Sequence, residues 1–177
     1  DGIFAPIFWI FTGIIIWNFS KNLPGPLTLA LIFKASSTLD SMIGYKQGRL
    51  KWLGTAGAKL DDILTWIPCR LVLITLPLIT LPWKQIPKTI KKALKEGRQD
   101  NSPNSGISEA IFANCIGIKM GGINKYKNKI ISKPEIAPDS PIPDKKSIKL
   151  LLDSIVLLEF LWIVLIGLII IFLIKFS

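Results

Sequence analysis

The sequence contains no histidine and only two cysteines, Cys69 and Cys115. Without histidine, its own residues cannot build a Cys/His zinc site, a Ser-His-Asp triad or a Cys-His dyad. A disulfide is not expected either, because Cys69 lies inside an apolar stretch. The chain opens on Asp1 without methionine or a signal-peptide pattern, so we expect a piece of a longer protein that lacks its N-terminal helices.

Acidic residues are also scarce, with 12 against 22 basic residues and a net charge of +10. Such an excess is typical of a nucleic-acid-binding protein, or of a membrane protein with lysines beside its helices on the cytoplasmic side. Half of the residues are hydrophobic (50%) and 19% are charged, which is unusually apolar for a soluble domain. Hydropathy therefore favours the membrane, and no nucleic-acid partner is expected.

Long uncharged runs predict an all-α integral membrane protein with several transmembrane or re-entrant helices and a basic cytoplasmic segment. The expected membrane helices cover about residues 3–19, 27–43, 63–83 and 155–174 of a single domain, 1–177. At about 1.5 Å per residue, such runs approach the roughly 30 Å of a hydrocarbon core. We therefore expect a multi-pass protein of the cell membrane, with the lipid bilayer as a partner.

The polar segment, residues 84–154, is rich in lysine beside both flanking apolar runs, which places it in the cytoplasm. Its first part, 86–94, is predicted to be an amphipathic surface helix. Its later part, 133–144, contains several prolines and is predicted to be a linker. A further connection, residues 44–57, is predicted between the second and third apolar runs.

Carboxylates beside the membrane helices are the first candidate functional residues. Asp61 and Asp62 can hold Mg²⁺ with bound phosphates or supply a general base, or can simply place favourable charge at a helix N-terminus. Asp40 and Lys34 lie on the second apolar run, where ionisable residues are functional candidates. The alternative for that pair is an ion pair at the interface, or snorkelling of Lys34.

Arg70 and a polar turn are the second candidates. Arg70 is either a clamp for phosphate or carboxylate, or a partner for Asp62. The turn SPNSG, residues 102–106, precedes a predicted helix at 107–118 with Glu109 in its first turn. Its backbone N–H groups suit an anion, although an ordinary helix N-cap fits the local spacing better. Residues 121–122, Gly-Gly, are predicted to cap the end of this helix, and no Walker-type phosphate loop is present.

Four stretches resemble motifs of one enzyme family. Residues 34–46, KASSTLDSMIGYK, are similar to its K-A-V-N-T-L-D-S-M-V-G-Y-K motif, and 58–71, AKLDDILTWIPCRL, to A-R-L-D-D-x-x-N-x-I-P-A-R-L. Residues 100–110, DNSPNSGISEA, resemble S-P-N-[AS]-G-x-x-E-A, and 120–126, MGGINKY, resemble L-G-G-x-N-x-Y. The family is that of the adenosylcobinamide-phosphate synthases of cobalamin biosynthesis, CobD/CbiB, and the chain resembles its C-terminal portion. Cys69 stands where the motif has alanine.

The resemblance implies a membrane enzyme, a ligase that forms a C–N bond. It would join the corrinoid adenosylcobyric acid to aminopropanol or aminopropanol phosphate, with ATP and Mg²⁺ as cofactors and other corrinoid-pathway enzymes as possible partners. Asp40, Asp61 and Asp62 are then the candidate catalytic residues, with Asp61 and Asp62 as metal ligands. The candidate residues for substrate or phosphate are Lys34, Arg70, Ser102, Asn104, Glu109, Asn124 and Tyr126. The competing class is a non-enzymatic membrane scaffold, regulatory or transport protein with the same fold.

Pro68, Pro77 and Pro82 make the third apolar run the hardest to place. Length favours a crossing, while the prolines favour kinks or a re-entrant shape. A full crossing would separate Asp61 and Asp62 from the Ser102 turn by roughly 30 Å, too far for one active site. We therefore predict that residues 63–83 bend back near Pro77 or Pro82, or lie deep in the interface.

Overall fold

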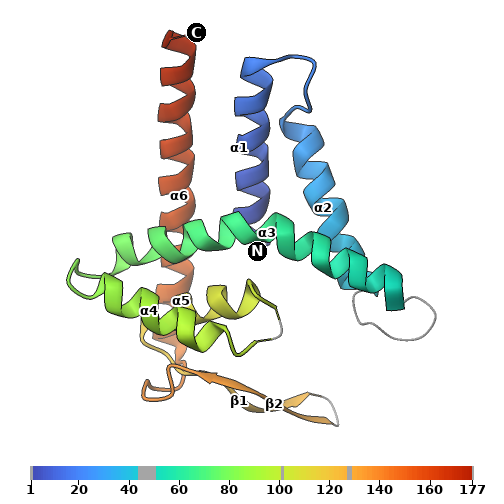
Figure 1. Ribbon diagram of the computed structural model, residues 1–177. Helices are drawn as coiled ribbons and strands as arrows, with labels where there is room; N and C mark the ends of the chain where they lie inside the picture. Colours follow the sequence, from blue (N-terminus) through green and yellow to red (C-terminus); the bar gives the residue numbers. More distant parts are fainter. Residues whose placement is uncertain (1, 44–50, 101, 127–128, 177) are drawn as a thin grey trace. The chain divides into compact units, whose positions relative to one another are not determined.

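The computed structural model describes residues 2–43, 51–100, 102–126 and 129–176 (Figure 1). Its elements are α1 (Phe4–Phe19), α2 (Pro26–Ile43), α3 (Lys51–Thr80), α4 (Ile86–Gly97), α5 (Ser105–Ile116), β1 (Met120–Tyr126), β2 (Lys129–Ile136) and α6 (Lys145–Phe176). The chain divides into two compact units. The first contains Asp1–Pro68 with Val164–Ser177, and the second contains Cys69–Ile163.

Close helix approaches organise the first unit. A Cβ atom on Gly13 of α1 would lie 2.4 Å from the Cα atom of Pro26, so only glycine fits where α1 meets the start of α2. The indole N–H of Trp9 donates a hydrogen bond of 3.0 Å to the backbone oxygen of Leu64, which ties α1 to α3. Gly57 of α3 lies against α2, because its Cβ atom would be 3.3 Å from the Leu39 side chain.

The second unit is built around the pair α4 and α5. A Cβ atom on Gly97 would lie 2.6 Å from the backbone nitrogen of Ile107, and one on Gly106 would lie 2.3 Å from the Gly97 oxygen. The two helices can pack this closely only because both positions are glycine. Side chains from α3, α5 and α6 bury the rest of this core, including Val72, Leu73, Leu76, Ile107, Ala110, Ile111, Ala113, Leu158 and Trp162.

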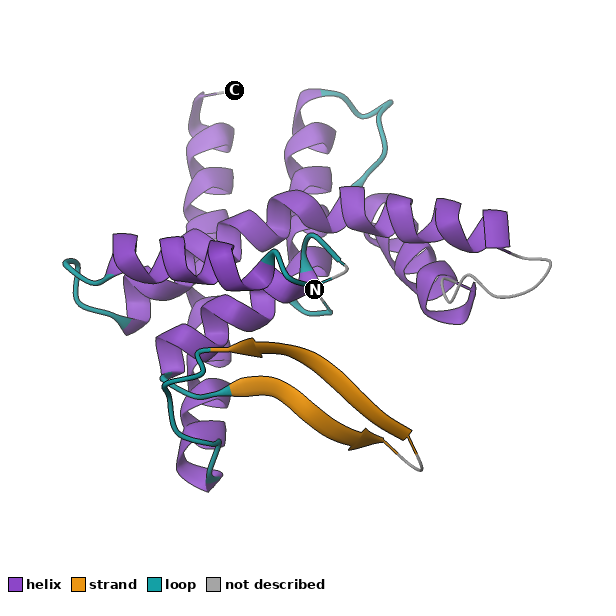
Figure 2. Ribbon diagram, turned by 60° about the horizontal axis from the view of Figure 1, so that its bottom comes forward, coloured by secondary structure: helices purple, strands orange, loops and turns teal. Residues whose placement is uncertain are grey.

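The chain is mostly helical, as predicted, but it also contains a two-stranded antiparallel hairpin that the sequence analysis missed (Figure 2). β1 contains the Gly121-Gly122 pair, so the prediction that this pair caps a helix is wrong. The cap of α5 is Gly117, at φ 75°. Gly121 and Gly122 also have positive φ, but they lie where the strand register shifts, which is typical of a β-bulge. A positive-φ glycine suits both places, so sequence alone could not separate them.

β2 also corrects the predicted linker, because its residues Lys129–Ile136 overlap the beginning of 133–144. Pro134 is accommodated in this two-stranded hairpin, where each strand has a partner on one side only. The remainder, from Ala137 to the start of α6, contains no helix or strand. The predicted surface helix 86–94 corresponds to α4.

The predicted apolar runs 3–19 and 27–43 correspond to α1 and α2, and 155–174 lies within the longer α6. Residues 63–80 of the predicted run 63–83 lie within α3, which already begins at Lys51, so the connection between α2 and α3 is shorter than the predicted 44–57. Residues 44–50, including the end of the first family motif, lie outside the described residues. α3 continues through Pro68 and Pro77, so the chain does not turn at Pro77, the first of the two positions predicted for a bend. The helix ends at Thr80, and the chain turns at Pro82, the second position predicted.

Buried packing explains why the prolines do not break α3. Proline removes one helical hydrogen bond and disfavours the preceding turn, and neighbouring side chains must offset that cost. Pro68 and Pro77 are among the most completely buried side chains of the described residues. By length and composition, two described helices are sufficient to cross a membrane, Gly54–Thr80 and Lys145–Leu173, and α1 is a shorter apolar helix.

Candidate functional site

The first unit brings together the three aspartates that the sequence analysis proposed. A Cβ atom on Gly57 would lie 3.7 Å from the backbone nitrogen of Asp40, which is ordinary contact distance. Asp61 follows Gly57 by one helical turn and therefore lies on the same face of α3. The carboxylate of Asp61 accordingly interacts electrostatically with those of Asp40 and Asp62. The close approach of α2 and α3 at Gly57 thus creates an acidic cluster, Asp40, Asp61 and Asp62.

One oxygen of this cluster is buried without compensation. Oδ1 of Asp61 is inaccessible to solvent and has no hydrogen-bond partner among the described residues. A buried carboxylate oxygen without a partner is costly, and a cation would relieve the cost. No group of three or more acidic, cysteine or histidine side chains is arranged as a complete metal cage within the described residues. Mg²⁺ does not need one, because it often uses one or two carboxylates together with substrate phosphates. The cluster therefore fits a phosphate-bound Mg²⁺.

The second unit holds Arg70 against the Ser-Pro-Asn turn. The guanidinium Nη1 donates a hydrogen bond to the side-chain oxygen of Asn104, and Nη2 donates one of 3.3 Å to the Pro103 oxygen. Asn104 is buried, with 1% exposure. Two donors fixed on one turn orient the plane of the guanidinium, which is a requirement for recognising a carboxylate or phosphate by paired hydrogen bonds.

Cys69 reinforces the same junction. Its thiol donates to the backbone oxygen of Asn104 at 3.3 Å, and the Ser108 hydroxyl donates to the Cys69 sulfur at 3.4 Å. Alanine, the residue of the resembling motif, could make neither contact. The cysteine that replaces the alanine of the motif therefore makes polar contacts with α5 and with the residue before it.

Ser102 and Asp100 organise the start of α5. The Ser102 hydroxyl accepts hydrogen bonds from the backbone N–H groups of Asn104 (3.3 Å) and Ser105 (3.4 Å). Asp100 accepts from the Ser102 N–H at 2.9 Å and from the Ser105 hydroxyl at 3.4 Å. This arrangement supports the capping interpretation of Ser102, while the Asn104 side chain is directed to Arg70 instead. α5 begins at Ser105, earlier than predicted, so Glu109 lies beyond its first turn.

The other predicted site residues lie on α2 and on β1. Lys34 is exposed on α2. Asn124 is exposed on β1, where its amide donates to the Gly122 oxygen at 3.2 Å. Tyr126 is the last residue of β1, and its side chain lies outside the described residues. The hydrogen bond of the Asn124 side chain therefore stays within the hairpin.

Glu96 is an important residue that the sequence analysis missed. One of its oxygens accepts hydrogen bonds from the Asn114 amide at 2.7 Å and from the Ala137 backbone N–H at 3.2 Å. Ala137 has a positive φ of 49°, an uncommon conformation for alanine. Glu96 thereby joins α4, α5 and the chain after β2. Its position in a lysine-rich helix gave no signal, because a surface ion pair explained it equally well.

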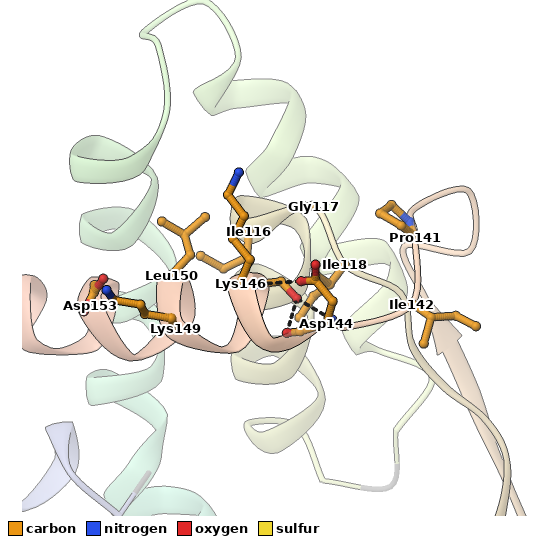
Figure 3. A pocket seen from close by; sticks show the side chains of 11 residues that line it. Ile116, Gly117, Ile118, Pro141, Ile142, Asp144, Lys146, Lys149, Leu150 and Asp153 are labelled. Atoms are coloured by element: carbon orange, nitrogen blue, oxygen red, sulfur yellow. Dashed lines mark hydrogen bonds between the residues drawn. The ribbon is translucent and has the colours of Figure 1, made fainter.

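A cavity of about 480 Å³ lies between the end of α5 and the start of α6 (Figure 3). Ile116, Ile118, Ile142 and Leu150 supply apolar walls, and none of the predicted site residues lines it. At its edge Asp144 accepts a 2.7 Å hydrogen bond from the Ser147 N–H, and the Ser147 hydroxyl accepts one of 2.8 Å from the Asp144 N–H. The hydrogen bond from the Ser147 N–H to the carboxylate lowers the pKa of Asp144, and the two reciprocal hydrogen bonds form a capping box for α6.

The chain is thus a mostly helical protein that contains, among its described residues, two helices long and apolar enough to cross a membrane. The chain belongs to the CobD/CbiB family, because the family model described as CobD/Cbib protein matches residues 1–155. No solved structure matches the chain significantly.

Similar curated proteins carry the name "Cobalamin biosynthesis protein CobD". The protein from Synechocystis is 42% identical over 134 residues, which is 76% of this chain and 37% of that protein. Those from Streptococcus sanguinis and Clostridium perfringens are 38% and 39% identical, over 79% and 77% of this chain and 41% and 40% of theirs. The chain thus spans about two-fifths of the length of these relatives.

Proposed function

We propose that this chain is part of a membrane enzyme of cobalamin biosynthesis. The reaction is the ATP-dependent formation of an amide between a side-chain carboxylate of adenosylcobyric acid and aminopropanol or its phosphate. The names of the curated relatives support the pathway. The reaction follows from the family resemblance together with the chemistry of the two clusters.

The observation that carries the proposal is the uncompensated oxygen of Asp61 beside Asp40 and Asp62. Amide formation from a carboxylate needs activation, and ATP supplies it with Mg²⁺ as counter-ion. Asp61 and Asp62 would hold that Mg²⁺, with Asp40 adding negative charge next to them. A purely structural scaffold has no need of a buried carboxylate oxygen without a partner.

Arg70 would bind an anionic group of a substrate. Asn104 and the Pro103 carbonyl fix its guanidinium, so an incoming carboxylate or phosphate would meet a preorganised arginine instead of a mobile one. Ser102 would act indirectly, because it caps α5 and thereby holds Asn104 in place. Lys34, Glu109, Asn124 and Tyr126 remain candidates for binding the rest of the substrates.

The exposed apolar surface of α6 supports the membrane location. Leu158 and Trp162 are buried, but most of the other large side chains of this helix are exposed, including Val156, Leu157, Phe160, Ile163, Val164, Leu168, Ile171 and Phe172. A helix that is hydrophobic all round is stable only when lipid or other protein covers it. We propose a multi-pass position in the cell membrane with residues 84–154 on the cytoplasmic side.

The test uses the full-length protein in membranes, supplied with adenosylcobyric acid, aminopropanol phosphate and Mg-ATP. Asp61→Asn and Asp62→Asn should each lower cobinamide phosphate formation more than about tenfold, because amides keep the size but lose the charge. Asp139→Asn, an exposed carboxylate in the turn after β2, is the matched control and should retain the native rate. Native turnover in both cluster variants would favour the non-enzymatic alternative or another site.

A further inference from the structure

Five cationic side chains follow one another along α4 and its two ends. They recur at alternating intervals of four and three residues, which places side chains on one face of a helix. All five are exposed, three within α4 and one beyond each end: Lys84, Lys88, Lys91, Lys95 and Arg98. The opposite face, with Ile86, Ala93 and Gly97, is buried. These five residues, here called the basic stripe, therefore point away from the core of their unit.

The acidic residue of α4 is kept out of the basic stripe. Glu96 is turned inward, with its side chain only 11% exposed, and its ion-pair partner is Lys92 at 3.8 Å. A further ion pair joins Lys119 to Glu135 and leaves the basic residues of α4 aside. Within the described part of the chain, no stripe residue forms a salt bridge. The basic stripe thus presents uncompensated positive charge to whatever covers it.

The neighbours of the stripe indicate what that partner is. α3, one of the two helices long and apolar enough to cross a membrane, ends at Thr80. Trp83, which is 79% exposed, stands between the end of that helix and the first stripe residue, Lys84. Exposed tryptophan is typical of the headgroup region of a bilayer, and lysines directly beyond a span are attracted to anionic lipids. Nucleic acid would account for the charge but not for Trp83 or its place after an apolar helix.

We propose that the basic stripe binds anionic lipid headgroups, so that α4 lies along the cytoplasmic surface of the membrane. The proposal rests on the membrane location proposed above but assigns a new interaction surface. Lysines beside a span also orient a protein during insertion. A stripe that only orients the protein during insertion needs no lasting contact with anionic lipid. A stripe that binds headgroups does, so only in that case should the contact depend on lipid composition and salt.

The test uses the full-length protein in nanodiscs of phosphatidylcholine, with or without phosphatidylglycerol. A reporter cysteine replaces exposed Gln85 beside the stripe, in a cysteine-free background, and an uncharged maleimide measures its rate of modification. A second reporter, Ile130→Cys in the exposed hairpin, reports any general effect of the lipid. The variant Lys88→Gln/Lys95→Gln weakens the stripe. The matched control Lys125→Gln/Lys133→Gln removes the same charge from exposed positions of the hairpin.

Phosphatidylglycerol should slow modification at Gln85→Cys by about fivefold or more, and leave Ile130→Cys unchanged. The protection should disappear at about 1 M salt, where the Debye length falls to about 3 Å. It should also disappear in Lys88→Gln/Lys95→Gln and persist in Lys125→Gln/Lys133→Gln. Equal rates in both lipids, or protection that survives loss of the stripe charges, would overturn the proposal. Protection by added RNA but not by phosphatidylglycerol would assign the stripe to nucleic acid. A chain that fails to enter nanodiscs would overturn both this proposal and the membrane location.

Discussion

Arg70 donates a hydrogen bond to the buried side-chain oxygen of Asn104 and thereby joins α3 to the turn that precedes α5. The two residues are separated by 34 positions in the chain and belong to two different family motifs. The Asn104 side chain makes no capping hydrogen bond to α5, and the Ser102 hydroxyl caps the helix instead. The turn is thus arranged to hold Arg70.

Removing the acceptor should therefore destabilise this junction. In Asn104→Ala, the Arg70 guanidinium loses a partner in a partly buried place, which typically costs about 1–3 kcal/mol. Thermal unfolding of the detergent-solubilised protein should show a clear fall in midpoint. Asn124→Ala, which loses only an exposed contact on the hairpin, should change the midpoint little. Equal midpoints for the two variants would mean that the Arg70–Asn104 contact contributes nothing to stability.

Sequence patterns predicted the positions of the helices better than they predicted the hairpin or the tertiary contacts. Apolar runs located α1, α2 and α6, because a long apolar segment with little charge has few alternatives to a helix. The hairpin was missed because β1 contains two glycines and β2 a proline, residues that usually interrupt strands. The β-bulge at Gly121 explains why a glycine stands in this strand. A Cβ atom there would lie 1.9 Å from the Pro134 oxygen, which leaves no room for a larger residue.

The acidic cluster could be anticipated in its members but not in its geometry. Asp61 and Asp62 are adjacent in sequence, whereas the approach of Asp40 depends on the packing of α2 against Gly57. Nothing local to Gly57 distinguishes a packing glycine from the glycine of a loop, and the predicted connection 44–57 included it. The hydrophobic periodicity of the sequence does not predict which helices pack against each other, so this contact appears only in the structure.

The contact between α4 and α5 gives a second prediction. Gly106→Ala would place a Cβ atom 2.3 Å from the Gly97 oxygen and 2.5 Å from the Asp100 side chain. The helices must separate to make room, and overpacking of this kind costs about 1–3 kcal/mol. Gly167→Ala is the matched control, because no atom lies within 4 Å of its Cβ position. Thermal unfolding should show a lower midpoint for Gly106→Ala and an unchanged or higher one for Gly167→Ala.

The thiol of Cys115 provides a prediction on pH. Burial raises its pKa, and this effect outweighs the opposing hydrogen bond from Thr80. Because alkylation requires the thiolate, a raised pKa keeps Cys115 in the unreactive neutral form to higher pH. The rate of iodoacetamide modification should rise at a higher pH than for a reference cysteine at the exposed position Ser132, measured as Cys115→Ser/Ser132→Cys. A Cys115 profile at or below that of the reference would contradict the effect of burial.

Membrane association is open to a direct test. The full-length protein should remain in the membrane pellet after high salt and after alkaline carbonate, since apolar helices with internally satisfied backbones are held by hydrocarbon. The basic stripe alone would give a different result, because electrostatic attachment is released by salt. Release by carbonate but not by salt would indicate a peripheral helix without a span.

The path of α3 gives the final prediction. The positive-inside rule predicts that the lysine-rich stretch from Lys84 to Arg98 is cytoplasmic, and the turn at Ser102 with it. If the acidic cluster and Arg70 serve one reaction, the groups that contact the reacting atoms must meet within about 3–3.5 Å, so both must be reached from that side. A helix that simply crossed the bilayer before its end at Thr80 would expose its beginning on the opposite side. We therefore expect cysteines at Gln47, which lies outside the described residues, and at Gln99 to react from the same side of sealed vesicles with an impermeant thiol reagent. Blocking first with a permeant reagent should abolish both signals, which controls for leakage. Labelling from opposite sides would show that α3 crosses completely, and either the shared site or the cytoplasmic placement of α4 would then be wrong.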